Sequence, residues 1–321
     1  MEKLIKAPRL AIVIPCYNEQ EALPITLPAL LGLLDRMTAQ GLVAPDSYLL
    51  CSNDGSTDNT WKLLEDEHLR DARVKAVSLA HNRGHQYALL AGLMTVMDNC
   101  DCCISIDADL QDDPEAMIEM VRKYREGCEV VYGVRSSRET DTFFKRTTAH
   151  AFYSFQKAMG LETVYDHADY RLLSNRALHL LAEYGESNMF MRGIVPMIGL
   201  KSDKVFYERA ARVAGQSKYP LSKMLSLSID GITSFSARPM RWIFFLGVFI
   251  LAVTLLVTVY VLVSYFFTPE VNRGWSSIML SIWGLGSIIL ISIGITGEYI
   301  GKIFNEVKHR PRYAISDRLW D

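Results

Sequence analysis

The chain has 321 residues, a formal net charge of −2 at pH 7 and a hydrophobic content of 50%. It contains no run of basic residues with interleaved aromatic residues, so the composition does not favour a nucleic-acid partner. The hydrophobic residues are unevenly distributed. The first 235 or so residues resemble a soluble α/β protein in composition, whereas the remainder contains two long uncharged apolar segments.

Six cysteines are present, three of them in the segment Cys-Asp-Cys-Cys at 100–103. This spacing lacks the Cys-x-x-Cys pattern of a zinc site and has no partner cluster elsewhere in the sequence. We therefore expect buried thiols in a reducing compartment. The first residues include no apolar segment typical of a signal peptide, and we expect none.

Apolar segments alternate with segments of helical periodicity over the first 134 residues. The segment 10–15 is a continuous apolar run that ends in proline, which is typical of a strand buried on both faces. The alternation predicts a doubly wound, mainly parallel α/β sheet. The expected strands are 10–15, 48–52, 74–79, 102–107 and 130–134, and the expected helices are 22–37, one through 64, 86–97 and 114–125.

Polar loops follow the first four of these strands, and Asp107 and Asp109 follow the fourth. Ligands of open α/β sheets bind at the carboxyl ends of the strands. Two carboxylates one residue apart repel each other unless a cation lies between them or one is protonated. Their hard oxygen atoms suit Mg²⁺ or Mn²⁺, with substrate phosphates completing the coordination. A solvated turn that leads into the next helix is the alternative interpretation.

The next region is less regular. We expect a helix at 143–159, a polar stretch at 166–172 that leads into a short strand, an edge strand at 204–209 and a basic loop at 212–219. Apolar residues between 221 and 235 recur on one face of a helix. That helix packs either on its own domain or at a bilayer surface, and we favour the surface.

The segments 242–267 and 276–297 contain no charged residue, and each is long enough to span ~30 Å of hydrocarbon. We expect a transmembrane hairpin, the alternative being two buried helices of a soluble protein. Basic residues flank both outer ends of the hairpin, so the positive-inside rule places both chain termini in the cytoplasm. These residues are Arg238 and Arg241 on one side and Lys302, Lys308, Arg310 and Arg312 on the other.

Six short motifs together resemble a known family. They include Asn-Asp-Gly-Ser-Thr-Asp at 53–58 and Asp-Ala-Asp-Leu-Gln at 107–111. The sequence is similar to the family 2 glycosyltransferases of GT-A fold, and within them to the polyprenyl-phosphate glycosyltransferases, such as the bactoprenol glucosyltransferases and dolichol-phosphate mannose synthase. The other four matching segments are 13–19, 82–86, 215–219 and 297–301.

This resemblance implies five parts of the chain: a cytosolic GT-A catalytic domain (1–218), an amphipathic juxtamembrane helix (219–241), two transmembrane helices (about 242–267 and 275–297) and a cytosolic C-terminal tail (298–321). It implies a multi-pass protein of the inner membrane and a homo-oligomer.

The resemblance also assigns roles to residues. Asp107 and Asp109 would carry the divalent cation, with Asp107 and Gln111 close to the donor. Asn53 stands where the family usually has aspartate, but the carboxylate expected to contact the base is that of the next residue, Asp54. The base and ribose of the nucleotide would lie against Pro15, Tyr17, Glu19 and Asp54.

The implied reaction is inverting transfer of a sugar from a nucleotide-sugar to a polyprenyl phosphate in the bilayer. The acceptor phosphate, with a second pKa near ~6, is largely a dianion at pH 7 and needs little help from a general base. Asp169 matches an acidic position proposed as catalytic, although a salt bridge to Arg171 explains it nearly as well. Groups expected to hold the phosphates are Arg135, Arg146, Ser217 and Lys218.

UDP-glucose is the first choice of donor, and GDP-mannose, UDP-N-acetylglucosamine and a modified arabinose are the alternatives. A processive polysaccharide synthase is disfavoured because residues 238–242 lack the glutamine of the Gln-x-x-Arg-Trp motif. A non-enzymatic membrane scaffold is disfavoured because it would have no reason to keep Asp54, Asp107 and Asp109 together.

Overall fold

The computed structural model describes residues 6–136, 167–186, 190–208 and 274–320, together with some positions between 240 and 259. The expected helices at 143–159 and 219–241, the basic loop at 212–219 and the turn of the expected hairpin lie outside the described residues. The chain forms two compact units, and residues from 310 onward belong to the first, with the N-terminal part of the chain. We describe each unit by itself.

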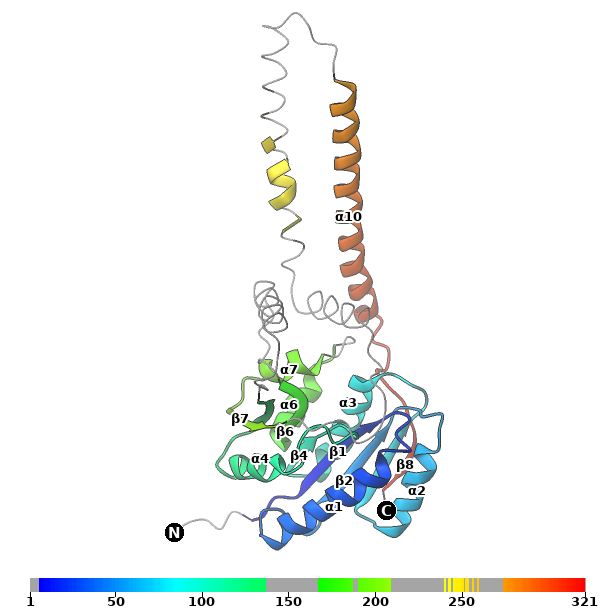
Figure 1. The fold of residues 1–321 in the computed structure, drawn as a ribbon, viewed down its shortest axis with the longest axis vertical. Helices are drawn as coiled ribbons and strands as arrows, with labels where there is room; N and C mark the ends of the chain where they lie inside the picture. Colours follow the sequence, from blue (N-terminus) through cyan, green and yellow to red (C-terminus); the bar gives the residue numbers. More distant parts are fainter. Residues whose placement is uncertain are drawn as a thin grey trace, which may run out of the picture. The chain divides into compact units, whose positions relative to one another are not determined.

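The first unit is an alternating α/β structure (Figure 1). Its first half consists of β1 (Leu10–Cys16), α1 (Leu23–Ala39), β2 (Tyr48–Asn53), α2 (Thr60–Arg70), β3 (Val74–Leu79), α3 (His85–Val96), β4 (Cys102–Ser105), α4 (Ala116–Arg125) and β5 (Val130–Arg135). The remaining described elements are β6 (His167–Ser174), α6 (Asn175–Glu183), α7 (Met191–Met197), β7 (Ser202–Tyr207) and β8 (Ile315–Leu319).

These strands form one eight-stranded sheet in the order β7-β5-β6-β4-β1-β2-β3-β8. Four neighbouring pairs are parallel, namely β1–β2, β1–β4, β2–β3 and β5–β7. Strand β6 is antiparallel to both β4 and β5, and β8 is antiparallel to β3. The predicted α/β class with a mainly parallel sheet is therefore confirmed.

The core explains why the parallel strands are so apolar. Successive side chains of a strand point to opposite faces of the sheet. On one face, Leu10, Ile12 and Ile14 of β1 pack in a cluster with apolar residues of α1, α2 and α4. On the other face, α3 lies so close that Gly92 contacts β1 and β2. All seven residues of β1 are buried, as expected for a strand covered on both faces.

Gly92 sets the distance between α3 and the sheet. A Cβ atom at this position would lie 2.5 Å from Val13 Cγ1, so we expect Gly92→Ala to lower the free energy of unfolding by ~1–3 kcal/mol through overpacking. Gly32 of α1 has no heavy atom within 4 Å of such a Cβ, and Gly32→Ala is the matched control. It should stabilise the protein by up to ~1 kcal/mol. Thermal unfolding of both variants tests this, and equal shifts would contradict it.

Two predicted boundaries, the end of the fourth strand and the start of the helix after it, differ from those in the structure. The fourth strand ends at Ser105 rather than at residue 107, because after Ile106 N donates to Val13 O the chain leaves the sheet. Helix α4 begins at Ala116 rather than at residue 114.

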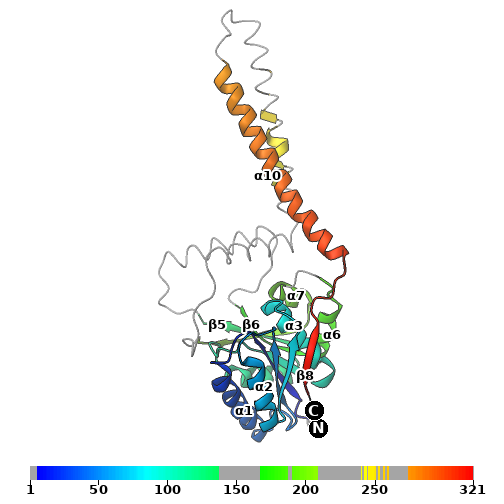
Figure 2. The same cartoon turned by 90° about the vertical axis from the view of Figure 1, so that its right-hand side faces the viewer.

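The segment 298–321, expected as a C-terminal tail, contains the end of a helix and a strand. Residues 315–319 form β8 on the outer edge of β3, and the preceding part of this segment continues a helix. The first unit therefore extends beyond residues 1–218, because the chain returns to its sheet at the C-terminus (Figure 2).

The second unit contains α10 (Trp275–Val307), 33 residues long. Its segment Gly284–Val307 is apolar and long enough to cross a membrane, and it is the one such helix within the described residues. Helix α10 ends ten residues after residue 297, the predicted end of the second transmembrane segment. The described positions between 240 and 259 are helical, but a two-helix hairpin stays a prediction.

Candidate active site

The loops after β1 and β2 are tied together at the carboxyl edge of the sheet. Asn18, with φ of +54°, donates its N–H to Ser56 Oγ at 2.9 Å, and its Oδ1 accepts from Thr57 N at 2.9 Å. Beside it Tyr17 is 38% exposed, and the N–H of Glu19 donates to Thr60 Oγ1 at 2.9 Å. Tyr17 is therefore accessible in the loop that follows β1.

Pro15 and Asn53 occupy neighbouring positions in this edge. Pro15 pairs with Ser52 of β2. The pairing of β1 with β4 ends at Val13, two residues before the proline. Because proline has no N–H, it is tolerated here, where no hydrogen bond to β4 is lost. The Asn53 amide donates to Ser78 Oγ at 3.0 Å and accepts from Ser56 N at 3.2 Å. Asparagine thus links β2, β3 and the following turn.

Asp54 is buried and bound by backbone groups. Its Oδ1 accepts from Arg83 N at 2.7 Å and its Oδ2 from Gly84 N at 2.8 Å. Burial raises the pKa of this carboxyl above its usual value, and the two N–H groups oppose that shift. Each oxygen accepts one N–H in the hydrogen bonds of the described residues, and a carboxylate oxygen can accept a second.

The loop 106–111 is held at several points. Thr26 Oγ1 of α1 donates to Ala108 O at 2.6 Å, and Gln111 N donates to Asp109 Oδ1 at 3.2 Å. Leu110 adopts a left-handed conformation with φ of +48°. The side chain of Gln111 is buried, whereas that of Asp107 is 45% exposed. Asp107 and Asp109 therefore lie on an anchored loop after β4.

Arg135, expected to hold phosphate, instead pairs with a buried carboxylate. Its Nε and Nη2 donate to Asp112 Oδ1 at 3.0 and 2.9 Å, and Tyr207 Oη donates to the same oxygen at 2.7 Å. Asp112 is 2% exposed, so the pair fixes the end of β5 beneath the loop 106–111.

Removing one donor from this cluster tests its contribution. Tyr207→Phe should lower the free energy of unfolding by ~2 kcal/mol, because the lost hydrogen bond goes to a buried charged group. Tyr170→Phe is a matched change, because the Tyr170 hydroxyl donates to the neutral carbonyl of Asp113 at 2.9 Å. It should cost ~1 kcal/mol. Chemical denaturation of both variants measures the difference, and a larger cost for Tyr170→Phe would contradict this account.

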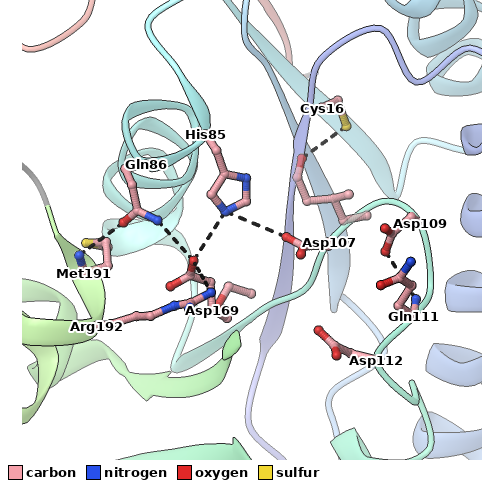
Figure 3. A network of polar contacts seen from close by, with 12 residues as sticks. Cys16, His85, Gln86, Asp107, Asp109, Gln111, Asp112, Asp169, Met191 and Arg192 are labelled. Atoms are coloured by element: carbon pink, nitrogen blue, oxygen red, sulfur yellow. Dashed lines mark hydrogen bonds and ion pairs between the residues drawn. The ribbon is translucent and has the colours of Figure 1, made fainter. Parts of the chain in front are cut away.

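Asp169 lies at the centre of a charged network (Figure 3). Its Oδ1 accepts from Arg171 Nη2, and its Oδ2 accepts from Gln86 Nε2 at 3.0 Å and from Arg192 Nη2 at 3.4 Å. His85 Nε2 lies 3.6 Å from Asp169 Oδ2 and 3.8 Å from Asp107 Oδ1. His85 therefore stands between the carboxylate of the network and that of the loop.

The groups around Asp169 shift the pKa of its carboxyl. Burial alone would raise the pKa of Asp169, but the neighbouring His85 and the charges of Arg192 and Arg171 hold it well below its usual range. The pKa of His85 is raised: burial opposes this, but Asp169 and Asp107 prevail. These neighbouring charges favour the ionised form of Asp169.

No role was predicted from the sequence for two members of this network, Gln86 and Arg192. Gln86, part of the Asn-Arg-Gly-His-Gln motif, was quoted without a role, and nothing in the sequence around Arg192 marks it. Arg146, Ser217 and Lys218 lie outside the described residues. All six cysteines are free and buried, as expected for structural thiols.

The donor set after β4 fits a divalent cation. Within the described residues, no group of three or more His, Cys, Asp or Glu side chains is placed to hold a metal ion by itself. Mg²⁺ is usually bound by one or two carboxylates together with water and substrate phosphates, and Asp107 and Asp109 supply that number. Burial, and after it the carboxylates of Asp169, Asp112 and Asp109, raise the pKa of Asp107, whereas His85 opposes this shift.

The fold and these loops define an α/β protein with a carboxylate-lined site at the carboxyl ends of parallel strands. The family model described as "Glycosyl transferase family 2" matches residues 11–194. The chain belongs to glycosyl transferase family 2, and this confirms the resemblance found in the sequence.

Similar proteins cover almost the whole chain. An uncharacterized glycosyltransferase of Bacillus subtilis, YkoT, is 49% identical over 98% of this chain and 93% of its own length. The bactoprenol glucosyl transferase of Shigella phage SfV is 34% identical over 96% of this chain and 98% of its own length. A solved structure of glucosyl-3-phosphoglycerate synthase from Mycobacterium tuberculosis, in complex with Mn²⁺, UDP-glucose and phosphoglyceric acid, is 16% identical with a TM-score of 0.43, over 70% of this chain and 78% of its own length.

Proposed function

We propose that this protein is a membrane-anchored inverting glycosyltransferase that moves a sugar from a nucleotide-sugar onto a polyprenyl phosphate. The observation that carries the proposal is the match to the bactoprenol glucosyl transferase over 96% of this chain. A match of that extent includes most of α10, the apolar helix, as well as the catalytic loops. An acceptor with a long hydrocarbon chain calls for such a helix beside a soluble site.

The donor would bind across the carboxyl ends of β1, β2 and β4. Asp107 and Asp109 would hold Mg²⁺ or Mn²⁺, which neutralises charge on the departing diphosphate, with Gln111 beside them. The base and ribose would contact Pro15, Tyr17, Glu19 and Asp54. The exposure of Tyr17 and the capacity of each Asp54 oxygen to accept a second hydrogen bond support this placement.

In the reaction, a phosphate oxygen of the acceptor forms a bond to the anomeric carbon. The bond between that carbon and the diphosphate oxygen breaks, and its electron pair leaves with the nucleoside diphosphate. The acceptor is largely a dianion at pH 7, since its second pKa is near ~6, so a protein base has little to remove. We therefore propose that Asp169 acts as a counter-charge, not as a base.

Positive charge must hold the acceptor phosphate close to the donor diphosphate. Arg192 is 44% exposed and uses a single N–H group, at 3.4 Å, in the hydrogen bonds of the described residues. A guanidinium has five N–H donors, so Arg192 can bind phosphate while Asp169 orients it. We propose His85 and Arg192 as acceptor-facing residues, alongside Arg146, Ser217 and Lys218; Arg135 would act through Asp112.

We propose glucose from UDP-glucose as the transferred sugar, with GDP-mannose, UDP-N-acetylglucosamine and a modified arabinose donor as alternatives. The names of several relatives support glucose. The membrane part would be a two-helix hairpin in the inner membrane with both termini in the cytoplasm, in a homo-oligomer. Flanking basic residues and the length of α10 support this topology.

A transfer assay tests the proposal. Membranes that contain the protein receive undecaprenyl phosphate, Mg²⁺ or Mn²⁺, and each labelled nucleotide-sugar in turn. We expect label in the lipid fraction with one donor, UDP-glucose first, and no label when the acceptor is undecaprenol. Absence of a lipid product with every donor, while the protein remains folded, would overturn the proposal.

A further inference from the structure

The C-terminal strap, residues 312–320, is built into the sheet on one side of the proposed donor site. Strand β8 pairs with β3 from Ala76 to Leu79, and Ala80 N donates to Ala314 O at 2.9 Å. At the far end, Lys75 Nζ donates to Trp320 O at 2.7 Å and lies 4.4 Å from the Trp320 ring. The strap is thus fixed at both ends.

The strap also holds the loop 81–84, which follows β3. Arg83 Nε donates to the carbonyl of Arg312 at 2.9 Å. The Arg312 side chain donates in turn to Tyr184 O at 2.9 Å, which anchors that carbonyl to the end of α6. The strap residues Tyr313 and Ile315 pack against apolar residues of β3 and α3.

On its other side, the same loop touches the turn after β2. A Cβ at Gly55 would lie 2.8 Å from backbone atoms of His81 and Asn82, so the two loops are in direct contact there. Gly55 has φ of +62°, which also favours glycine. The loop 81–84 is therefore confined between the Gly55 turn and the strap.

This confined loop supplies the groups that hold Asp54. The N–H groups of Arg83 and Gly84 are the two donors to its carboxylate. A displacement of Arg83 would move those donors. Because Asp54 is buried, water could not replace the lost hydrogen bonds. The contacts therefore run without a gap from Tyr184 through Arg312 and Arg83 to Asp54.

We propose that the C-terminal strap is a positioning element of the nucleotide site, which acts through Arg312 and Arg83 to hold Asp54 ready for a nucleoside diphosphate. This inference rests on the proposed function, because it takes Asp54 as a nucleotide contact. Four residues, 308–311, separate the strap from the end of α10. The C-terminal strap, which would position the nucleotide site, thus follows the apolar helix α10 almost directly in the sequence.

A double-mutant cycle in the full-length protein in detergent tests this inference. Arg83→Met removes the donor to the Arg312 carbonyl, and Arg312→Met removes the anchor of that carbonyl without touching Arg83. Calorimetry with UDP and with GDP measures Kd. We expect each change to weaken binding of the preferred nucleotide ~5-fold, and the double variant to be little weaker than either single one.

The controls separate positioning from other roles. Lys75→Met loosens the Trp320 end of the strap, remote from Arg83, and should lower the melting temperature while leaving Kd within twofold. Arg83→Lys keeps a donor and should recover part of the affinity. If Arg83→Met weakens binding but Arg312→Met does not, Arg83 contacts the nucleotide directly and the inference is wrong. Unchanged affinity in both variants also overturns it, whereas a wild-type protein that binds neither nucleotide overturns the proposed function.

Discussion

Asp109→Asn is expected to lower the rate of sugar transfer about a thousandfold while the protein remains folded. An amide is a neutral and weaker ligand for a hard divalent cation, so the variant would lose the charge that balances the departing diphosphate. A loss of ~4 kcal/mol in transition-state stabilisation corresponds to about three powers of ten in rate. Initial rates of lipid labelling at saturating Mg²⁺ or Mn²⁺ measure the effect.

Asp113→Asn is the matched control for this change. Asp113 lies on the same loop, and its Oδ1 accepts from Glu115 N at 3.0 Å, a bond that the asparagine oxygen can retain. Its transfer rate should stay within about threefold of the wild type. The cation assignment would be wrong if Asp109→Asn kept at least a tenth of the wild-type rate.

Asp169→Ala is expected to lower the free energy of unfolding by ~3–5 kcal/mol. The change leaves Arg171, which is 1% exposed, as a buried charge without its carboxylate. Burial disfavours the charged form of Arg171 and lowers its pKa, an effect that Asp169 opposes and that would be uncompensated without this carboxylate. With ~2–4 °C of melting temperature per kcal/mol for a domain of this size, the shift should be about 10 °C.

An exposed ion pair provides the comparison. Asp203 pairs with Lys123 at 2.6 Å and is 49% exposed, and Asp203→Ala should cost less than ~1 kcal/mol. Differential scanning fluorimetry of both variants distinguishes the two environments. Similar shifts in melting temperature would show that the Asp169 network contributes no more than a surface pair.

The Asp169 network also predicts a pH dependence of stability. The pKa of Asp169 is lower in the folded protein than in the unfolded chain, where it is ~3.9. The unfolded state therefore takes up this proton first, and the stabilisation is complete above about pH 4 and is lost as the pH falls toward the folded pKa. Asp169→Asn should show a smaller loss of stability than the wild type when the pH is lowered from 5 to 3.

The parallel part of the sheet could be predicted because burial on both faces leaves a clear pattern. Strands β1 and β3 are short apolar segments with turn residues after them. Strand β8, Ile-Ser-Asp-Arg-Leu, has exposed polar residues in its interior because it lies at an edge. Its partner β3 is more than 230 residues away in the sequence, and no local pattern links the two.

The residues of the candidate site likewise fall into two groups: those that a local sequence pattern indicates and those that only the tertiary structure brings together. Asp54, Asp107 and Asp109 could be proposed from the sequence because each lies shortly after an apolar strand. The partners of Asp169 come from α3, β6 and α7, so their convergence depends on the tertiary structure. Arg135 has the residue type of a phosphate ligand, but its partner Asp112 could be identified only from the structure.

The products of one reaction test the central claim most directly. Purified protein is incubated with the labelled donor that it accepts, undecaprenyl phosphate and Mg²⁺ or Mn²⁺, and the nucleotide and the lipid product are identified by mass spectrometry. The account predicts equal amounts of nucleoside diphosphate and of a lipid carrying one phosphate between the polyprenyl chain and the sugar. Release of nucleoside monophosphate with a lipid diphosphate product, or of free sugar without any lipid product, would contradict it.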